Sequence, residues 1–208
     1  IYYFKNNRKM VKTIIKQTFS GYVQKGPFIN GSAITIIDLD ENLDQTGRSY
    51  NSSISDNTGK FEQNNISLTT GFASLRADGF YFNEVTGEIS SSQLTLNALA
   101  DITDINSVNV NLLTHMEKSR IEYLVKNKDY SFEEAKLQAQ KDILKIFSIE
   151  KENVGNSEQL NVSADGDDNA ILLAISTIIQ GYRPVSEMSE LIANIITDIK
   201  EDGQLNDS

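Results

Sequence analysis

Cysteine and tryptophan are both absent from the chain, and histidine occurs once in 208 residues. Without cysteine the protein has no disulfide framework, no thiolate metal site and no thiol nucleophile. The single histidine, His115, cannot by itself build a histidine-rich metal centre and gives no basis for a nucleophilic triad. We therefore expect His115 to have a structural role near the start of a helix, and we expect no cofactor and no enzymatic activity.

Long apolar runs are missing as well. A membrane-spanning helix needs about 18 or more consecutive apolar residues, and no segment of this sequence has them. The opening stretch IYYFKNNRKMVKTII contains basic residues, but its longest apolar run is too short for the core of a signal peptide. The sequence therefore predicts no membrane span.

Positive charge is scarce, because the chain has 19 lysines and arginines against 29 aspartates and glutamates, a net charge of −10. Such an acidic surface disfavours unaided binding to nucleic acid or anionic lipid, which depends on clustered cations. The first 20 residues are the exception, since they hold five basic residues and no acidic one. Residues 1–12 are interpreted as a basic arm, which either is a solvated tail or docks on the acidic body of a neighbouring copy.

The composition of the rest of the chain changes near residue 98. Before this point Gly, Asn, Ser and Thr separate short apolar runs, as in strands joined by turns. After it Leu, Ile, Ala, Glu and Lys recur at helical spacing. We predict an α+β protein of two domains, an antiparallel β-sandwich over residues 13–98 and a helical domain of about four helices over residues 99–208.

Seven segments of the first domain are predicted as short strands at a spacing of roughly 8 to 12 residues, which is typical of a sandwich. The clearest turn is SDNTGKF, which begins at Ser55. There Asp56 and Asn57 can hydrogen-bond to nearby backbone, and Gly59 can adopt a positive φ without steric cost. We expect residues 13–23 to close the chain's own sandwich rather than extend into a neighbouring copy. The predicted strands cover residues 13–23, 29–38, 48–54, 60–68, 72–77, 81–86 and 94–98.

Three stretches of the first domain resemble a known family. They are GYVQKGPFINGSAITIIDLDENLDQTGRSY, SDNTGKFE and ADGFYFNEVTGEISSSQLTLNAL. They resemble the transthyretin-like, carboxypeptidase-regulatory-like β-sandwich of uncharacterised cell-envelope lipoproteins of Bacteroidetes-type bacteria. The stretch NVNLLTHMEKSRIEYLVKNKDYSFEEAKLQAQKDILKIFSI is similar to the helical segment that follows the sandwich in those lipoproteins. The resemblance implies a non-catalytic sandwich and a lipid-anchored relative, although this sequence shows neither the signal peptide nor the lipidated cysteine of the family.

Four helices are predicted after residue 98 from apolar residues at helical spacing. The second begins at a capping box, in which the side chains of Ser131 and Glu134 each bond to the other residue's backbone. The third, for which we expect Asp167 or Asp168 to be the N-cap, is strongly apolar, and we expect it to be the most buried helix. The predicted apolar faces run from Val110 to Val125, from Ala135 to Phe147, from Ile171 to Ile179 and from Met188 to Ile199.

Two acidic clusters concentrate the oxygen ligands that calcium prefers, DLDENLD at residues 38–44 and ADGDDN at residues 164–169. Neither fits the EF-hand loop; in the first, Leu43 stands where that loop needs glycine. We interpret the first cluster as a hairpin turn and the second as a helix N-terminus whose acids complement the helix dipole. We therefore predict no metal site. The candidate ligands, should a metal bind, are Asp165, Asp167 and Asp168.

Aromatic residues in GFYFNE, residues 79–84, raise the question of a glycan or protein partner. Strand alternation places Phe80 and Phe82 on one face and Tyr81 on the other. Core packing in a sandwich accounts for this pattern without a ligand. Tyr81 is nevertheless the candidate for an exposed, ligand-binding aromatic residue.

These patterns lead us to expect a non-enzymatic extracellular or cell-envelope protein that works as a binding or display module, with a protein or glycan as partner. The alternative is a filament or assembly subunit in which residues 1–23 engage another copy, because an edge strand is a template for pairing. A hydrolase of unknown class is the third hypothesis. The ligand, the oligomeric state and the role of residues 1–12 do not follow from the sequence.

Overall fold

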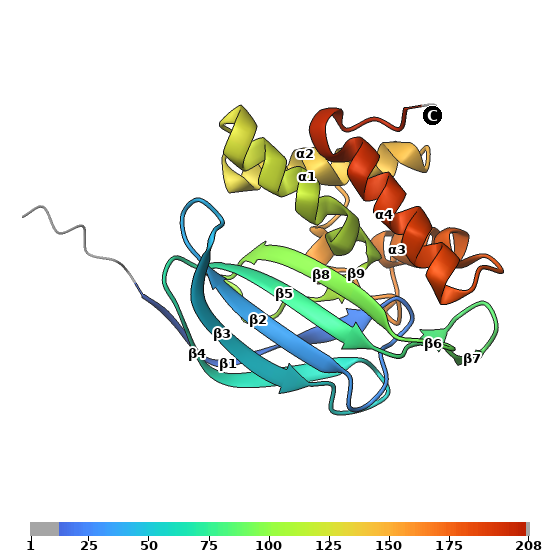
Figure 1. Ribbon diagram of the computed structural model, residues 1–208, viewed down its shortest axis with the longest axis horizontal. Helices are drawn as coiled ribbons and strands as arrows, with labels where there is room; N and C mark the ends of the chain where they lie inside the picture. The colour runs from blue at the N-terminus through green and yellow to red at the C-terminus, as the bar shows by residue number, and fades with distance from the viewer. Residues whose placement is uncertain (1–12, 207–208) are drawn as a thin grey trace, which may run out of the picture.

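The computed structural model describes residues 13–206, which form a β-sandwich with four α-helices gathered on one side of it (Figure 1). This arrangement confirms the predicted α+β fold, an antiparallel β-sandwich followed by helices. In the described part of the chain, no helix is long and apolar enough to cross a membrane. The strands are β1 Ile14–Gln24, β2 Ala33–Leu39, β3 Gln45–Ser53, β4 Lys60–Leu68, β5 Phe72–Gly79, β6 Phe82–Asn83, β7 Glu88–Ile89, β8 Leu94–Asp101 and β9 Val110–Asn111.

The sandwich consists of a three-stranded sheet in the order β4-β1-β9 and a four-stranded sheet in the order β3-β2-β5-β8. Within these sheets all neighbours are antiparallel except β1 and β9, which are parallel. Strand β1 pairs with β4 over most of its length, beginning with Ile14 opposite Leu68. This pairing confirms that residues 13–23 close the chain's own sandwich. The predicted basic arm, residues 1–12, and self-association through it lie outside the described residues.

Side chains of β3 cover the outer edge of β4. The hydroxyl of Tyr50 donates to the carbonyl oxygen of Ser67 and accepts from the amide of Ser67, both at 2.8 Å. Ser52, also on β3, donates to the carbonyl oxygen of Glu62 at 2.6 Å. Because these backbone groups would otherwise be free to pair with another strand, β3 protects the edge that β4 presents.

Four helices follow, at the positions of the predicted apolar segments. Helix α2 begins at the predicted capping box, since the Ser131 amide donates to Glu134 Oε2 at 2.9 Å and the Glu134 amide donates to Ser131 Oγ at 3.3 Å. Helix α3 begins after Gly166, whose φ is 115°. Asp167 and Asp168 lie in its first turn and do not cap it, contrary to expectation, because Gly166 takes the cap position. The helices are α1 Leu112–Lys128, α2 Phe132–Ile146, α3 Asp167–Gln180 and α4 Val185–Asp202, with a short 3-10 helix, η1 Ser157–Gln159, before α3.

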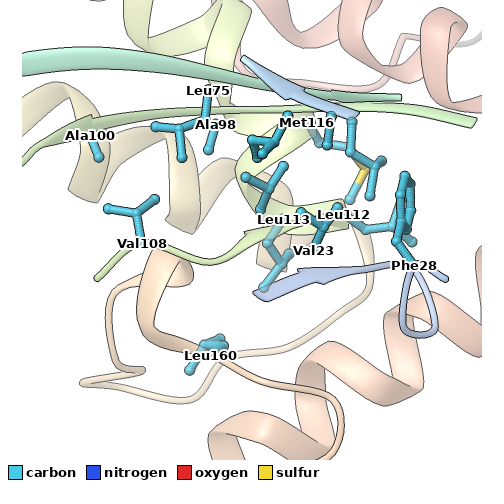
Figure 2. Packing of buried hydrophobic residues seen from close by; sticks show 14 of the residues in the cluster. Val23, Phe28, Leu75, Ala98, Ala100, Val108, Leu112, Leu113, Met116 and Leu160 are labelled. Carbon is cyan, nitrogen blue, oxygen red and sulfur yellow. The ribbon is translucent and has the colours of Figure 1, made fainter. Parts of the chain in front are cut away.

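The sandwich and the helices share one apolar core. Figure 2 shows Leu112 and Met116, from the first turns of α1, among side chains of the strands, including Val23 of β1 and Ala98 of β8. Strand structure also extends beyond Ala98, because β8 continues to Asp101 and β9 returns beside β1. Both the strands and the core therefore cross the position at which composition divides the chain.

Helices α1 and α2 cover the outer face of the four-stranded sheet on its β8 side. A second apolar cluster joins Leu99 of β8 and Leu39 of β2 to Ile121 of α1 and Ala135 of α2. Helix α1 has more buried residues than α3. The expectation that α3 is the most buried helix is wrong, because α3 packs through one face and leaves Ile178 of the other face exposed.

Candidate functional site

A cavity of about 380 Å³ lies between the sandwich and the helices. Its walls come from the start of β5, the loop that follows β8, helices α1 and α2, and residues 154–159. Ligand pockets commonly combine apolar walls with a small number of placed polar groups. This cavity has both, and it is the candidate functional site.

Glu117 of α1 is fully buried in the lining of this cavity. Its Oε1 accepts a hydrogen bond from the hydroxyl of Ser157 at 2.5 Å, whereas its Oε2 has no hydrogen-bond partner among the described residues. Burial raises the pKa of Glu117 to about 7, although the nearby Lys136 ammonium acts in the opposite direction. The carboxyl group therefore changes its charge near neutral pH.

Buried amide side chains hold Ser157 against Glu117. The side-chain nitrogen of Asn111, which caps α1, donates to the carbonyl oxygen of Ser157 at 2.7 Å. The side-chain nitrogen of Gln140 on α2 donates to the carbonyl oxygen of Gly155 at 2.8 Å and to the Ser157 hydroxyl oxygen at 3.0 Å. The floor of the cavity is therefore a hydrogen-bonded network that fixes the orientation of the Glu117 carboxyl group.

Glu158 is a second buried carboxylate of the cavity, and it is already paired. Its Oε2 forms an ion pair with the ammonium group of Lys136, which also lies 3.5 Å from the carbonyl oxygen of Leu99. Both side chains of the pair are largely buried. Glu117 therefore differs from Glu158 in having a buried acceptor atom to which no group of residues 13–206 donates.

The mouth of the cavity is acidic and partly apolar. Asp104 and Glu133 are exposed there, and the rings of Phe72 and Phe132 pack on one wall with their centroids 4.8 Å apart. The whole lining contains five carboxyl groups and one ammonium group, that of Lys136. The arrangement favours a cationic or hydrogen-bond-donating ligand over an anion.

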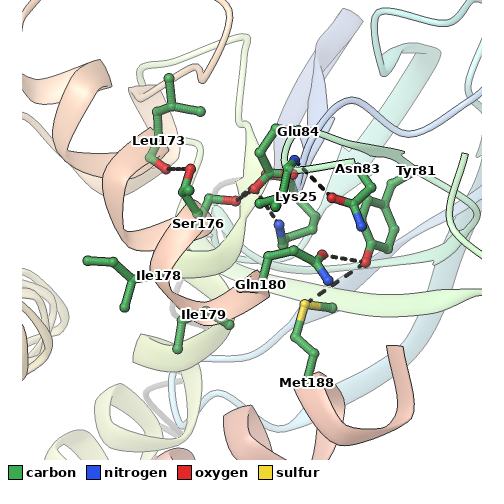
Figure 3. A network of polar contacts seen from close by, with 12 residues as sticks. Lys25, Tyr81, Asn83, Glu84, Leu173, Ser176, Ile178, Ile179, Gln180 and Met188 are labelled. Carbon is green, nitrogen blue, oxygen red and sulfur yellow. Dashed lines mark hydrogen bonds and ion pairs between the residues drawn. The ribbon is translucent and has the colours of Figure 1, made fainter. Parts of the chain in front are cut away.

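A second buried polar cluster joins the sandwich to α3, near the opposite end of β5 (Figure 3). The ammonium group of Lys25 pairs with Oε1 of Glu84, and the Ser176 hydroxyl lies 2.7 Å from the same oxygen. The Tyr81 hydroxyl donates to Oε1 of Gln180 on α3 at 2.8 Å. Burial lowers the pKa of Lys25, against the opposing effect of Glu84. The Lys25 side chain has no exposed surface and, unlike Glu117, does not belong to the lining of the cavity. The cluster fixes α3 on the sandwich.

Tyr81, the sequence-based candidate for an exposed aromatic residue, is completely buried. Its ring stacks on Phe28 with the centroids 6.2 Å apart, whereas Phe82, which alternation places in the core, is 43% exposed. The prediction assumes a strand over residues 81–86, but β6 contains only Phe82 and Asn83 and forms a short hairpin with β7. The alternation therefore has the opposite phase, and Tyr81 does not reach a surface partner.

The candidate metal ligands Asp165, Asp167 and Asp168 lie around the start of α3. Asp168 accepts from the amide of Gly155 at 2.9 Å and from the ammonium group of Lys151 at 2.7 Å, whereas the Asp167 side chain is 93% exposed. In the described part of the chain, no group of three or more His, Cys, Asp or Glu side chains is placed to hold a metal ion. The contacts of Asp168 tie α3 to the segment before it.

The other acidic cluster, residues 38–44, forms the predicted hairpin turn between β2 and β3. Oδ1 of Asp40 accepts from the amides of Asn42 at 2.8 Å and Asp44 at 3.0 Å. Asp38 is buried and accepts from both the amide and the hydroxyl of Thr69, at 2.8 and 2.6 Å. The oxygens of these two aspartates therefore hold the turn and its neighbouring loop in place.

His115 fixes α1 against β8. Its Nδ1 accepts a hydrogen bond from the backbone amide of Asn97 at 3.2 Å. Burial lowers the pKa of His115 to about 4. The ring is therefore neutral at physiological pH, and it does not belong to the lining of the cavity.

Sequence reasoning missed Glu117 and Ser157. Glu117 carries a signal, because it lies four residues after Leu113 and four before Ile121 and so places an acid on the apolar stripe of α1. Ser157 carries no comparable signal, since it is 40 positions from Glu117 and meets it only in the folded chain.

Comparison with protein-family models and with curated proteins found no match to this chain. The resemblance to Bacteroidetes-type lipoproteins therefore stays a prediction. The function has to be argued from the geometry of the cavity.

Proposed function

We propose that the protein is a non-enzymatic binding module, acting outside the cell or in the cell envelope, whose ligand occupies the cavity between the sandwich and helices α1 and α2. The observation that carries this proposal is the unpartnered buried oxygen of Glu117. A buried polar atom without a partner destabilises the folded state by about 1–3 kcal/mol. A ligand that donates a hydrogen bond to Glu117 Oε2 supplies the missing partner.

The cavity is built like a binding site rather than like a packing defect. Empty defects in protein cores are apolar, whereas the polar floor of this cavity is held in place by Asn111 and Gln140. Its mouth reaches solvent through exposed residues such as Glu133 and Leu137. Walls that are ordered before binding lower the entropy lost when a ligand enters.

The location outside the cytoplasm is supported by the family resemblance of the sandwich and of the helices. Labelling of intact cells with an amine reagent that cannot cross membranes tests it, because the protein has exposed lysines such as Lys60 and Lys141. We expect these lysines to be modified while a cytoplasmic control protein is not. Equal protection of both proteins would place this one inside the cell.

A ligand-observed NMR screen of small molecules against the intact chain tests the binding function. Asn156 is exposed at the cavity and makes no side-chain cap to η1, so Asn156→Trp should occlude the mouth without breaking a cap. Thr86→Trp is the matched control, because Thr86 is exposed beyond β6, at the other end of β5.

We expect compounds that bind the unmodified chain and Thr86→Trp to lose binding to Asn156→Trp. If every compound that binds the unmodified chain binds Asn156→Trp equally well, the cavity is not the binding site. If no compound binds and residues 1–23 prove to hold the chain in an oligomer, the assembly-subunit alternative replaces the proposal.

Acid–base catalysis is a second candidate function, because Glu117 has a pKa of about 7 in a cavity. Hydrolysis needs a further acid, base or nucleophile, and the other buried carboxylate of the lining, Glu158, is paired with Lys136. A screen of hydrolase substrates separates the two functions. Turnover that is lost in Glu117→Gln would favour the enzyme, whereas binding without turnover is expected for the binding module.

A further inference from the structure

We infer that the ligand of the cavity is a small organic cation, a primary amine or guanidine with an apolar body, whose charged group lies against Oε2 of Glu117. This inference rests on the proposed function and names the ligand class of the same site. Three features of the cavity lead to it: the balance of charge in its lining, its aromatic wall and the buried Oε2 of Glu117 on its floor, which has no partner among the described residues.

The charge balance of the lining favours a cation. Four carboxyl groups besides Glu117 line the cavity, and the only ammonium group among its lining residues, that of Lys136, is held by Glu158 and the Leu99 carbonyl. A cation that enters therefore meets negative potential at the mouth, from Asp104 and Glu133, and a carboxylate at the floor. An anion would meet repulsion along the same path.

The aromatic wall suits the apolar body of such a ligand. Phe72 and Phe132 pack against each other there, and Ile105 and Val154 add aliphatic surface. Apolar area removed from water on this wall adds binding free energy, and an aromatic face also attracts a nearby cation. An alkyl- or arylalkylamine presents both parts, a hydrophobic body and a donor head.

The floor distinguishes an organic cation from a metal ion. Hard metal ions require several oxygen ligands around one point, and no metal-binding group of three or more such residues occurs among residues 13–206. An ammonium or guanidinium group needs only acceptors within hydrogen-bond distance. Glu117 Oε2 is such an acceptor, and no protein donor competes for it in the described part of the chain.

Binding of a cation is coupled to the charge of Glu117. Lys136 on α2 and Glu158 on η1 are the charged groups that act on Glu117 from the elements packed against it. An alkylamine keeps its charge up to about pH 10, so it binds best when Glu117 is ionised, and binding releases a proton from the protonated form. With a pKa of about 7 for Glu117, affinity for an amine should rise about tenfold between pH 6 and pH 8.

Calorimetry with matched probes tests the inference on the intact chain. The cationic probes are phenethylamine, butylamine and butylguanidine. Phenethyl alcohol is the neutral analogue of phenethylamine, and phenylacetate is its anionic analogue. We expect at least one cationic probe to bind, with the alcohol at least tenfold weaker and phenylacetate showing no binding. Glu117→Gln should abolish the pH dependence of binding and lower the affinity for the cationic probe about tenfold at pH 8. Glu122→Gln is the control, because Glu122 is on the same helix and outside the lining; it should change neither the affinity nor its pH dependence.

A second variant keeps the test valid if Glu117→Gln folds poorly. The double change Asp104→Asn with Glu133→Gln alters only exposed residues of the mouth, and it should weaken the cationic probe roughly threefold at low salt, as expected for screened surface charges.

The outcomes separate this inference from the proposed function. Binding of phenethyl alcohol as tight as that of phenethylamine, or binding of no cationic probe, overturns the cation class. The proposed function survives either result if other compounds still require the open cavity in the Asn156→Trp comparison. A cationic probe that binds Asn156→Trp as well as the unmodified chain overturns the inference, since it binds elsewhere.

Discussion

The hydroxyl of Tyr81 and the side-chain oxygen of Gln180, 99 positions apart in the sequence, share a buried hydrogen bond of 2.8 Å (Figure 3). The bond runs from the end of the sandwich to the last residue of α3. Burial raises the pKa of Tyr81 to about 12, so the hydroxyl keeps its proton and donates at all physiological pH values. Together with the pair of Lys25 and Glu84, it fixes how α3 lies on the sandwich.

Removal of the Tyr81 hydroxyl should destabilise the protein. Tyr81→Phe leaves Oε1 of Gln180 buried without this donor, which costs about 1–3 kcal/mol of unfolding free energy. Tyr182→Phe is the matched control, because Tyr182 is 98% exposed, and it should change stability by less than about 0.5 kcal/mol. Urea denaturation of the two variants measures the difference; equal stabilities would contradict the structural role of the bond.

Loss of charge at Glu84 should be more damaging than the same change on an exposed pair. Glu84→Gln leaves the ammonium group of Lys25 buried without a counter-ion, and we expect a loss of about 3 kcal/mol. Asp44→Asn, which removes the partner of exposed Lys126, should cost at most about 1 kcal/mol.

A double variant shows whether the loss at Glu84 comes from the stranded charge. Lys25→Met removes that charge, so Lys25→Met combined with Glu84→Gln should be more stable than Glu84→Gln alone. Denaturant unfolding of the four chains of this cycle gives the coupling energy. Additive losses would show that Lys25 and Glu84 do not act as a pair.

Local sequence signals predicted the parts of the fold that depend on neighbouring residues. The turn at Ser55 forms as expected, with Oδ1 of Asp56 accepting from the Thr58 amide at 2.8 Å and Gly59 at a φ of 82°. The capping box of Ser131 and Glu134 also forms. Both motifs are closed by hydrogen bonds within a few residues, which is why local sequence predicted them. Asn57 is the exception, because its Oδ1 accepts from the distant amide of Asn30 at 3.0 Å rather than from nearby backbone.

The candidate site depends on distant contacts, and this is why the sequence did not reveal it. Tyr81 forms an isolated β-bridge with Phe28 instead of lying in the predicted strand over residues 81–86, and its ring stacks on that of Phe28. Its side chain is therefore buried where the alternation of the predicted strand suggested exposure. Glu117 acquires its unusual pKa through burial, beside Lys136 of α2 and Ser157 and Glu158 of η1, which are distant from it in the sequence. In the sequence Glu117 is only an acidic residue on the apolar stripe of a helix, and a salt bridge is the usual explanation of such a residue.

Glycine is needed at position 59 for two separate reasons, and a matched pair of variants separates them. Gly59 and Gly47 both adopt a positive φ, of 82° and 86°. A Cβ at position 59 would lie 2.3 Å from the carbonyl oxygen of Val23, whereas nothing lies within 4 Å at position 47. Gly47→Ala should therefore cost about 1 kcal/mol from backbone strain alone.

Gly59→Ala carries the same strain and a clash with the backbone of β1, so we expect it to cost at least about 2 kcal/mol more than Gly47→Ala. Thermal unfolding of both variants measures the difference. Equal melting temperatures of Gly59→Ala and Gly47→Ala would mean that the turn moves away from the Val23 carbonyl oxygen without loss of stability.

Two buried groups should give the stability of the protein opposite dependences on pH. The pKa of Glu117 is raised to about 7 from its ordinary value near 4.5, so its contribution to stability is complete below about pH 4.5 and is lost as pH rises through 7. The pKa of His115 is lowered to about 4 from 6.5, so its contribution is complete above pH 6.5 and is lost as pH falls through 4. Between pH 4.5 and 6.5 the two effects should nearly cancel.

Each of these two pH dependences of stability should become measurable in a variant that lacks the other group. In Glu117→Gln the effect of His115 remains, so unfolding free energy should rise by about 3 kcal/mol from pH 4 to pH 6.5, since each tenfold step in proton affinity is worth about 1.4 kcal/mol. In His115→Gln, whose side chain can still accept from the Asn97 amide, unfolding free energy should fall by about 3 kcal/mol from pH 4.5 to pH 7. Denaturant unfolding over this range measures both slopes. The difference between the slope of each variant and that of the unmodified chain isolates one group, because the other titratable groups contribute to both chains. A Glu117→Gln slope equal to that of the unmodified chain would show that Glu117 titrates as it does in the unfolded chain, and the site would lose its titratable carboxyl.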